Sequence, residues 1–206
     1  MEENSPYQQD LASIRKLMER SVKFISLSGL SGILAGVYAL AGAGFVYLTI
    51  QYPAPVYQPL SYQLPSSVFL PIAVTAVLVL LFSIGTGIGL SYRKAAKAGI
   101  RFWDTTARHM VISLAIPLVA GGLFMVILMM GGYFEILCAA CLIFYGLALI
   151  HASPNLYEEV RYLGYLEILL GLIAGLLPGY GLVLWALGFG VLHILYGAIM
   201  FKRYDL

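Results

Sequence analysis

Two side chains that exchange protons occur within apolar stretches of this sequence. Glu167 lies in the segment GYLEILLG, and His193 lies in GFGVLHILYG. Glu167 follows Arg161 by six residues, which is a rise of about 9 Å along a helix. His193 precedes Lys202 by nine residues, or roughly 13 Å. Because consecutive helices run in opposite directions, the two side chains fall at similar depths, and we expect them to meet.

The Glu167/His193 pair has two interpretations. Glu167 shares a helical face with Gly164 and Gly171, so this face is predicted to contact a neighbouring helix and not lipid. As a proton-sensitive pair, the two groups would bind and release protons inside the bundle. As an ordinary interhelical hydrogen bond, they would contribute roughly 1 kcal/mol and need no further role. The second interpretation is favoured, because pumps and enzymes usually contain more than one such pair.

Cys138 and Cys141 form a C-x-x-C motif. The motif is similar to that of membrane thiol oxidoreductases, which pass electrons to quinone. Those enzymes relay electrons through additional cysteines, whereas this chain has two cysteines in all. A metal site is also short of ligands, because His109 and His151 are predicted near the opposite, cytoplasmic helix ends. We therefore predict that the cysteines are packing residues, and that the protein holds no metal and no cofactor.

A candidate hinge lies in the apolar stretch at 110–130. Pro117 removes one backbone hydrogen bond there and frees the carbonyl of Ser113. Gly121 and Gly122 follow closely. The pattern predicts a kink, which serves either a moving gate or packing alone, and packing is the commoner outcome.

Membrane helices must position these residues. Of the 206 residues, 61% are hydrophobic and 11% are charged, whereas soluble domains carry about 25% charged residues. A bilayer crossing needs about 20 apolar residues, and the six predicted crossings are 24–50, 67–92, 110–130, 134–152, 163–177 and 182–201. The predicted fold class is all-α: a polytopic membrane protein with six transmembrane helices arranged as three helical hairpins. No soluble-enzyme motif occurs, so an enzyme is not favoured.

The basic residues predict the orientation of the chain. All twelve fall on one side of the predicted crossings, so the positive-inside rule places both termini in the cytoplasm. The predicted organisation is a cytoplasmic amphipathic N-terminal helix at 1–23, a transmembrane domain at 24–201 and a cytoplasmic tail at 202–206. A basic belt between the second and third crossings is predicted to contact lipid headgroups. The belt consists of Arg93, Lys94, Lys97, Arg101 and Arg108.

Small residues are predicted to hold the bundle together, because helices in lipid associate through close contact. The first crossing carries a stripe of Ser28, Gly32, Gly36, Ala39 and Ala43. The pairs Gly85–Gly89 and Gly171–Gly175 repeat the small-xxx-small spacing. Packing within one chain is favoured over a homo-oligomer, which stays an alternative. At the start of the fifth helix, Asn155 is predicted to be the N-cap, with Glu158 completing a capping box.

Three blocks of the sequence resemble an uncharacterised family of small six-helix bacterial inner-membrane proteins. The blocks are IRKLMERSVKFISLSGLSGILAG (14–36), FWDTTARHMVISLAIPLVAGGLF (102–124) and RYLGYLEILLGLIAG (161–175). The resemblance implies a location in the bacterial inner membrane, without any assigned chemistry. Such proteins sometimes bear the label beta-carotene 15,15'-monooxygenase, which does not apply here: carotenoid oxygenases are β-propellers that hold iron with four histidines, and this chain has three. Family members also resemble partners of small winged-helix regulators, which implies regulation.

The favoured function is a non-enzymatic sensor, regulatory or scaffolding module, whose basic cytoplasmic face meets lipid headgroups and a protein partner. The alternative is a small proton-coupled transporter or channel that uses Glu167, His193 and the Pro117 kink. Direct binding of nucleic acid is not expected, because the basic residues are few and lie at the membrane surface. A continuous polar path through the bundle would favour transport, and a dry core would favour the regulatory role.

Overall fold

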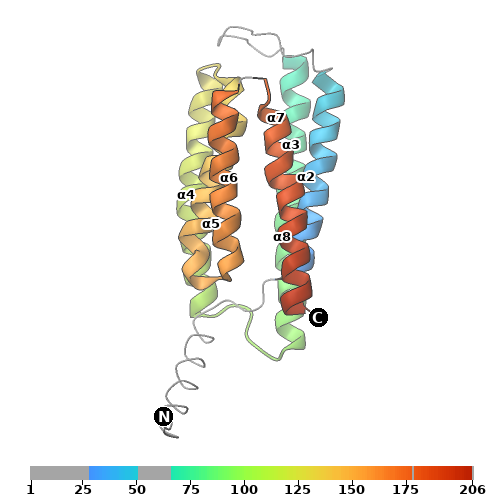
Figure 1. Ribbon diagram of the computed structural model, residues 1–206, viewed down its shortest axis with the longest axis vertical. Helices are drawn as coiled ribbons and strands as arrows, with labels where there is room; N and C mark the ends of the chain where they lie inside the picture. The colour runs from blue at the N-terminus through green and yellow to red at the C-terminus, as the bar shows by residue number, and fades with distance from the viewer. Residues whose placement is uncertain (1–27, 51–65, 178, 206) are drawn as a thin grey trace, which may run out of the picture.

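The computed structural model of the protein describes residues 28–50, 66–177 and 179–205. All the regular elements in these ranges are helices, and they stand side by side along the long axis of the molecule (Figure 1). The predicted N-terminal helix at 1–23 and most of the predicted outer connection at 51–67 lie outside the described residues.

Six rods make up the described bundle. The first five are α2 (Gly29–Ile50), α3 (Ser66–Lys97), α4 (Thr105–Met130), α5 (Leu137–Ala152) and α6 (Glu158–Leu176). The sixth rod is a continuous run of α7 (Gly181–Trp185), η3 (Ala186–Leu192), α8 (His193–Met200) and η4 (Phe201–Asp205). Two single 3₁₀ turns, η1 (Phe134–Ile136) and η2 (Ser153–Asn155), flank α5.

Five helices of the described chain are long and apolar enough to cross a membrane. Their bounds are Gly29–Thr49, Phe69–Lys97, Thr105–Met130, Phe134–Asn155 and Gly181–Asp205. The prediction of an all-helical bundle with several membrane-crossing helices is therefore confirmed for these segments. α6 differs because its 19 residues include four charged ones, Glu158, Glu159, Arg161 and Glu167.

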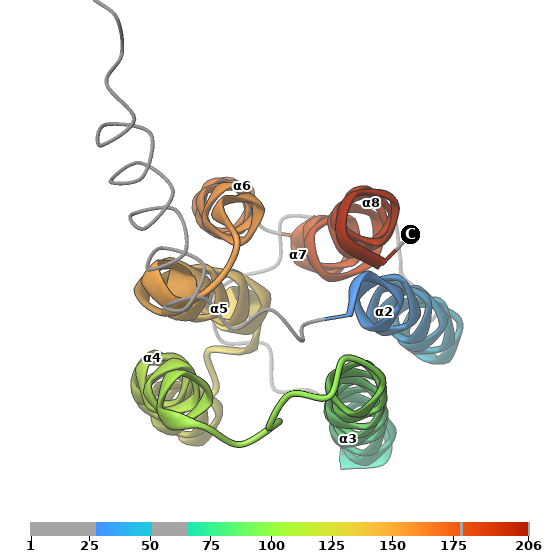
Figure 2. The same ribbon diagram turned by 90° about the horizontal axis from the view of Figure 1, so that it is seen from below.

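The rods form two groups of three. In the first, which we call the α5 group, α5 packs against both α4 and α6 (Figure 2). In the second, the α2 group, α2 packs against both α3 and the sixth rod. The two groups meet chiefly where the sixth rod lies against α5 and α6, whereas α3 and α4 scarcely contact each other. Polar residues on the sixth rod, α5 and α6 are thus placed to link the two groups.

Glycines bring the helices together within each group. A Cβ atom added to Gly36 of α2 would lie 2.6 Å from the carbonyl oxygen of Gly190 on the sixth rod. A Cβ added to Gly146 of α5 would lie 2.6 Å from the carbonyl oxygen of Gly164 on α6. Real Cβ atoms do not come this close to a backbone, so these helix pairs depend on the missing side chains.

The predicted small-residue stripes are used unequally. Gly32 and Gly36 of the first stripe face the sixth rod, and Gly171 faces Ile143 of α5. Gly85 and Gly89, in contrast, have no described atom within 4 Å of an added Cβ. The prediction for this last pair is wrong in the described part of the chain, because α3 turns that face away from every described helix.

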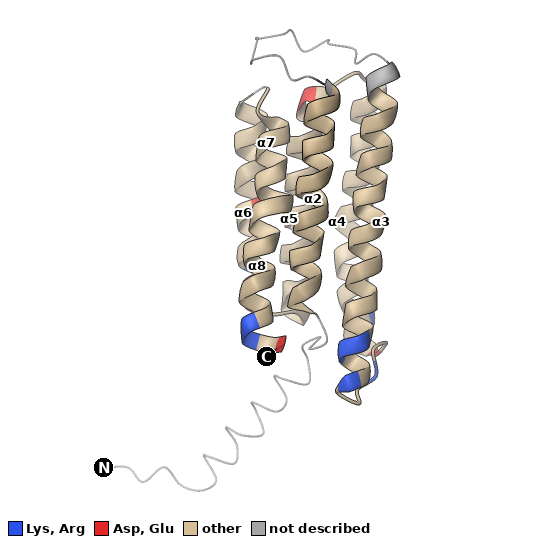
Figure 3. Ribbon diagram, turned by 90° about the vertical axis from the view of Figure 1, so that its right-hand side faces the viewer, with Lys and Arg blue, Asp and Glu red and all other residues tan. Residues whose placement is uncertain are grey.

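The basic residues of the described chain gather at one end of the bundle, beside the C-terminus (Figure 3). We call this the basic end. α3 continues to Lys97, beyond its predicted end at residue 92, so part of the basic belt lies on a helix. α4 begins at Thr105, because the Asp104 carboxylate caps it by accepting the Ala107 N–H at 2.7 Å.

The start of α6 differs from the prediction. Asn155 belongs to η2, and α6 begins at Glu158 after Tyr157, which makes no side-chain cap hydrogen bond. The predicted capping box is therefore wrong. The physical reason is that α5 runs directly into η2, which leaves Asn155 in a helical turn, whereas an N-cap residue needs extended backbone. Tyr157 has that backbone, with φ −73° and ψ 150°.

Residues 201–205, most of which are predicted to be a tail, form the helical turns of η4. Asp205 accepts hydrogen bonds from the Gly29 N–H at 2.8 Å and from Lys94 Nζ at 2.5 Å. One carboxylate thereby joins the first residue of α2 to the last turn of α3. A carboxylate at a helix N-terminus also interacts favourably with the helix dipole.

The same turns bind α6. Arg203 Nη1 lies 2.5 Å from Glu159 Oε1, and the Tyr204 hydroxyl donates to the same oxygen at 3.0 Å. The ring of Tyr204 stacks on Tyr157, with centroids 4.0 Å apart. We call residues 203–205 the C-terminal clasp, because they bind both groups at the basic end.

Replacing Gly146 with alanine is expected to lower the free energy of unfolding by about 1–3 kcal/mol, because the added methyl group forces α5 and α6 apart. The control is Gly85→Ala, on the open face of α3, which is expected to be neutral or slightly stabilising through helix propensity. Unfolding by SDS in mixed micelles, followed by circular dichroism, measures both. Equal losses for the two variants would contradict the close approach of α5 and α6.

Candidate functional site

A polar cluster lies where the two groups meet. Glu167 comes from α6, His193 from α8 and Tyr145 from α5. His193 Nδ1 lies 3.4 Å from Glu167 Oε1, and His193 Nε2 lies 2.7 Å from the Tyr145 hydroxyl. The structure therefore brings together the two residues paired from the sequence and adds Tyr145. We call these three residues the Glu167 cluster.

Hydrogen bonds fix the proton positions on the imidazole ring of His193. The carbonyl oxygen of Gly188 lies 3.0 Å from Nδ1 and only accepts, so Nδ1 carries a hydrogen. Neutral His193 then accepts a hydrogen bond from Tyr145 at Nε2. Protonated His193 would donate from Nε2 to the same hydroxyl, which both donates and accepts. The ring thus gains or loses a proton while keeping both hydrogen bonds.

The Glu167 carboxyl group is enclosed without a hydrogen-bond partner. Its side chain is 0% exposed, and neither oxygen has a partner among the described residues. His193 Nδ1, at 3.4 Å from Oε1, is farther than the roughly 2.7–2.9 Å of a charge-assisted hydrogen bond. Room for the carboxyl exists because residue 188 is glycine, where a Cβ would lie 2.5 Å from Oε2. Burial of an unpartnered polar group is costly, so stability does not explain its presence.

Aromatic rings pack the cluster from the side opposite the basic end. Trp185, Phe189 and His193 recur every four residues, with ring centroids 5.0 Å apart for the first pair and 5.6 Å apart for the second. Tyr145 packs on Phe189 at 4.7 Å. Sequence analysis did not assign Trp185 or Phe189 to a site, and it did not pair Tyr145 with Glu167 or His193. The four-residue spacing of rings that ends at His193 is the signal that would have found two of them.

The rod that carries His193 is not a regular α-helix. Residues 186–192 form the π-helix η3, a rare geometry that occurs frequently at functional sites. Gly190 and Gly197 of this rod pack on Leu40 and Ile33 of α2. The wider turn of the π-helix lets the glycines approach α2 while the imidazole reaches α5 and α6.

The predicted hinge residues pack against α5. α4 runs unbroken through Pro117, and the freed carbonyl of Ser113 accepts a hydrogen bond from His151 Nδ1 at 2.7 Å. A Cβ at Gly121 would collide with a side chain of α5, whereas Gly122 has no described atom within 4 Å. The contacts favour packing over a moving gate, and they give His151 a role that sequence analysis missed.

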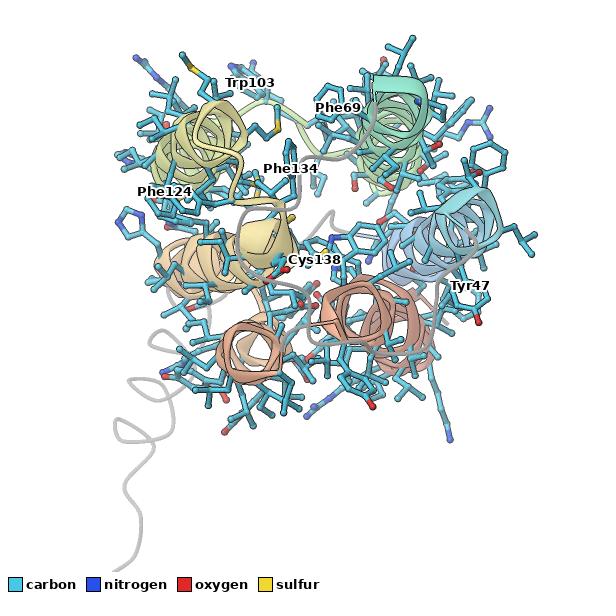
Figure 4. All side chains as sticks on the ribbon, turned by 90° about the horizontal axis from the view of Figure 1, so that it is seen from above. Tyr47, Phe69, Trp103, Phe124, Phe134 and Cys138 are labelled. Atoms are coloured by element: carbon cyan, nitrogen blue, oxygen red, sulfur yellow. The ribbon has the colours of Figure 1, made fainter. Side chains whose placement is uncertain are left out.

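The two cysteines are free thiols on α5. Cys138 lies toward the middle of the bundle (Figure 4), where it contacts Gly181 at the start of the sixth rod. Cys141 lies beside the side chain of Trp185 on the sixth rod. Within the described ranges, no three His, Cys, Asp or Glu side chains gather closely enough to hold a metal ion.

One member of the basic belt has a partner within the protein. Lys94 forms an ion pair with Asp205 of the C-terminal clasp, at 2.5 Å. The other four residues are exposed at the basic end: Arg93, Lys97, Arg101 and Arg108. Contact of these four with lipid headgroups stays a prediction.

Two hollows of the described chain lie away from the Glu167 cluster. One, of about 320 Å³, is an apolar groove between α2 and α3 that runs past Tyr38, Phe45 and Phe82. The other, of about 240 Å³, lies on α3 alone. Neither is lined by a residue of the Glu167 cluster.

Comparison with protein-family models, with curated proteins and with solved structures finds no match to this chain. The resemblance to small bacterial inner-membrane proteins therefore stays a prediction.

Replacing Tyr145 with phenylalanine leaves Nε2 of His193 buried without its partner. The free energy of unfolding is expected to fall by about 1–3 kcal/mol, and the ¹⁵N chemical shift of Nε2 is expected to change. Tyr165→Phe, at a hydroxyl on the exposed face of α6, is the matched control. An unchanged Nε2 shift in the Tyr145 variant would contradict the hydrogen bond.

Proposed function

We propose that this protein is a non-enzymatic regulatory or scaffolding module of a bacterial inner membrane, and that the Glu167 cluster is its proton-sensitive element. The observation that carries the proposal is the enclosed carboxyl of Glu167, 3.4 Å from His193, at the junction of the two helix groups. A proton gained or lost there changes the charge of the junction. Charges act strongly in a low-dielectric interior, so the two groups pack differently in the two protonation states.

The C-terminal clasp supports a link from the cluster to the basic end. Arg203 follows His193 by ten residues on the same rod, a distance of about 15 Å. A shift of that rod against α6 at His193 would act directly on the Arg203–Glu159 ion pair. The proposed readout is therefore a change at the basic end, sensed by lipid headgroups and a protein partner.

A proton-coupled transporter has less support. Transport requires the carboxyl group to reach water from both sides in turn. Glu167 is 0% exposed, and the stack of Trp185 and Phe189 fills the side away from the basic end. The described hollows are apolar and lie elsewhere. An enclosed carboxyl favours regulation over transport.

The proposed topology has six crossings with both termini in the cytoplasm. α6 is more charged than the five long apolar helices, but it packs along α5 within the bundle (Figure 1). This position supports counting α6 as a crossing. The gathering of Lys and Arg at one end of the bundle supports the orientation (Figure 3).

The topology is tested with single cysteine substitutions, introduced one at a time into a variant in which Cys138 and Cys141 have been replaced. In intact cells, an impermeant maleimide is expected to label Tyr133→Cys and to leave Ala98→Cys unlabelled until the membrane is opened. The two positions lie at opposite ends of the bundle, next to helix ends. Labelling of both positions in intact cells would overturn the proposed topology.

Replacing Glu167 with glutamine tests the proposed function. Spin labels on Val37 of α2 and Leu147 of α5, both exposed, report the distance between the groups in liposomes. The distance distribution of the otherwise unaltered protein is expected to change between about pH 5 and 8, the range in which histidine charge changes. Glu167→Gln is expected to abolish that change, because a neutral amide leaves the charge of His193 without a carboxylate to interact with across the junction.

The matched control is Glu158→Gln, at an exposed carboxylate on the first turn of α6, which is expected to keep the pH response. A response that survives Glu167→Gln would refute the proton-sensitive role. Steady proton flux into liposomes that depends on Glu167 would favour the transporter instead.

A further inference from the structure

A line of polar groups follows the seam between α6 and the sixth rod. Glu159 and Glu167 lie eight residues apart on α6, roughly two helical turns. The sixth rod carries His193, Tyr196 and Tyr204 along the facing side. The Glu167 cluster occupies the middle of this seam, and the Glu159–Tyr204 contact occupies its basic end.

Tyr196 stands between these two polar sites. Its hydroxyl oxygen is enclosed and has no hydrogen-bond partner among the described residues. The hydroxyl interacts electrostatically with Glu159 and Tyr204 on one side and with Tyr145 on the other. Tyr145 and Tyr196 also pack on the same apolar cluster, which includes Leu163. A buried hydroxyl without a partner is uncommon in proteins, and bound water usually satisfies such a group.

Away from the basic end, the same seam is closed by rings and aliphatic side chains. Trp185 and Phe189 stack there, and Leu142 and Ala174 form a buried apolar cluster with them. Among the described residues, the titratable groups that face the Glu167 carboxyl are Tyr145 and Cys141 of α5 and His193 of the sixth rod, and Tyr196 adjoins Tyr145. Of these groups, Cys141 lies on the side away from the basic end. The oxygen-bearing groups therefore extend from Glu167 toward the basic end.

We propose that the Glu167 cluster exchanges its proton with the water at the basic end alone, through Tyr196 and water bound between Tyr196 and Glu159. In each transfer, a hydroxyl or water oxygen accepts one proton as it donates another, so the relay itself is unchanged. The proton arrives at His193 Nε2 through Tyr145, while Nδ1 keeps its hydrogen bond to the Gly188 carbonyl and lies 3.4 Å from Glu167 Oε1. This inference rests on the proposed function, to which it adds the side of the membrane that is sensed.

Infrared spectroscopy of the carboxyl band that is lost in Glu167→Gln measures the exchange. Full-length protein is reconstituted in liposomes whose orientation is known from labelling of Ala98→Cys. The pH is changed, or D₂O is added, on one side of the membrane. The band is expected to respond faster when the change is made on the side of the basic end. Tyr196→Phe keeps the ring and removes the relay hydroxyl, and it is expected to slow the response about a hundredfold. Tyr165→Phe, on the lipid-facing side of α6, is the control.

Glu159→Gln is a second variant, in case Tyr196→Phe does not fold, and it is also expected to slow the response from the basic end. Equal rates from the two sides, or an unchanged rate in a folded Tyr196→Phe or Glu159→Gln protein, would overturn the relay and leave the proposed function standing. A carboxyl band that never responds to pH would overturn both.

Discussion

The enclosure of one carboxyl group, that of Glu167, constrains the rest of the bundle. A carboxyl inside an apolar bundle must be kept from lipid, so α6 turns it toward α5 and the sixth rod. That position exists because Gly188 offers no side chain in the space that Oε2 occupies. Gly188, which could be taken for an ordinary packing glycine, is therefore part of the site.

The same constraint explains why the two helix groups are joined where they are. Each group is held internally by glycine contacts, such as Gly36 with Gly190 and Gly146 with Gly164. Between the groups, contacts are concentrated along the sixth rod, which bears the Glu167 cluster at its middle and the C-terminal clasp at its end. Polar contacts at this junction depend on geometry and on charge, whereas apolar contacts respond little to protons. The junction is thus the part of the bundle on which the proposed proton-sensitive function depends.

The depth and the meeting of Glu167 and His193 could be predicted from the sequence, because helical rise and hydrophobic boundaries determine both. The apolar runs likewise predicted the helices, with errors of a few residues at their ends. Tyr145 could not be assigned in the same way, since a tyrosine in an apolar helix is common and its partner depends on tertiary packing. The π-helix η3 has no sequence signature in this reading, although it decides that Gly190 faces α2.

Local signals failed where a neighbouring element competed for the same residues. Asn155 is a suitable N-cap residue, but the continuation of α5 into η2 holds it in helical backbone. Residues 202–206 are polar enough for a tail, but Asp205 finds the N-terminus of α2 and Lys94 nearby. The second outcome depends on contacts between segments far apart in the chain, which periodicity and composition do not encode.

The direction of the polar seam bears on the choice between sensing and transport. A transporter needs alternating access to its carboxyl group, and therefore polar groups on both sides of it. Here hydroxyl and carboxylate groups extend from Glu167 toward the basic end through Tyr196 and Glu159, while rings close the opposite side. A site that is polar on one side equilibrates with one compartment, and its protonation follows the pH of that compartment. Under the proposed function, such a site would report a condition and carry no net flux, which is the property that a membrane-embedded regulator requires.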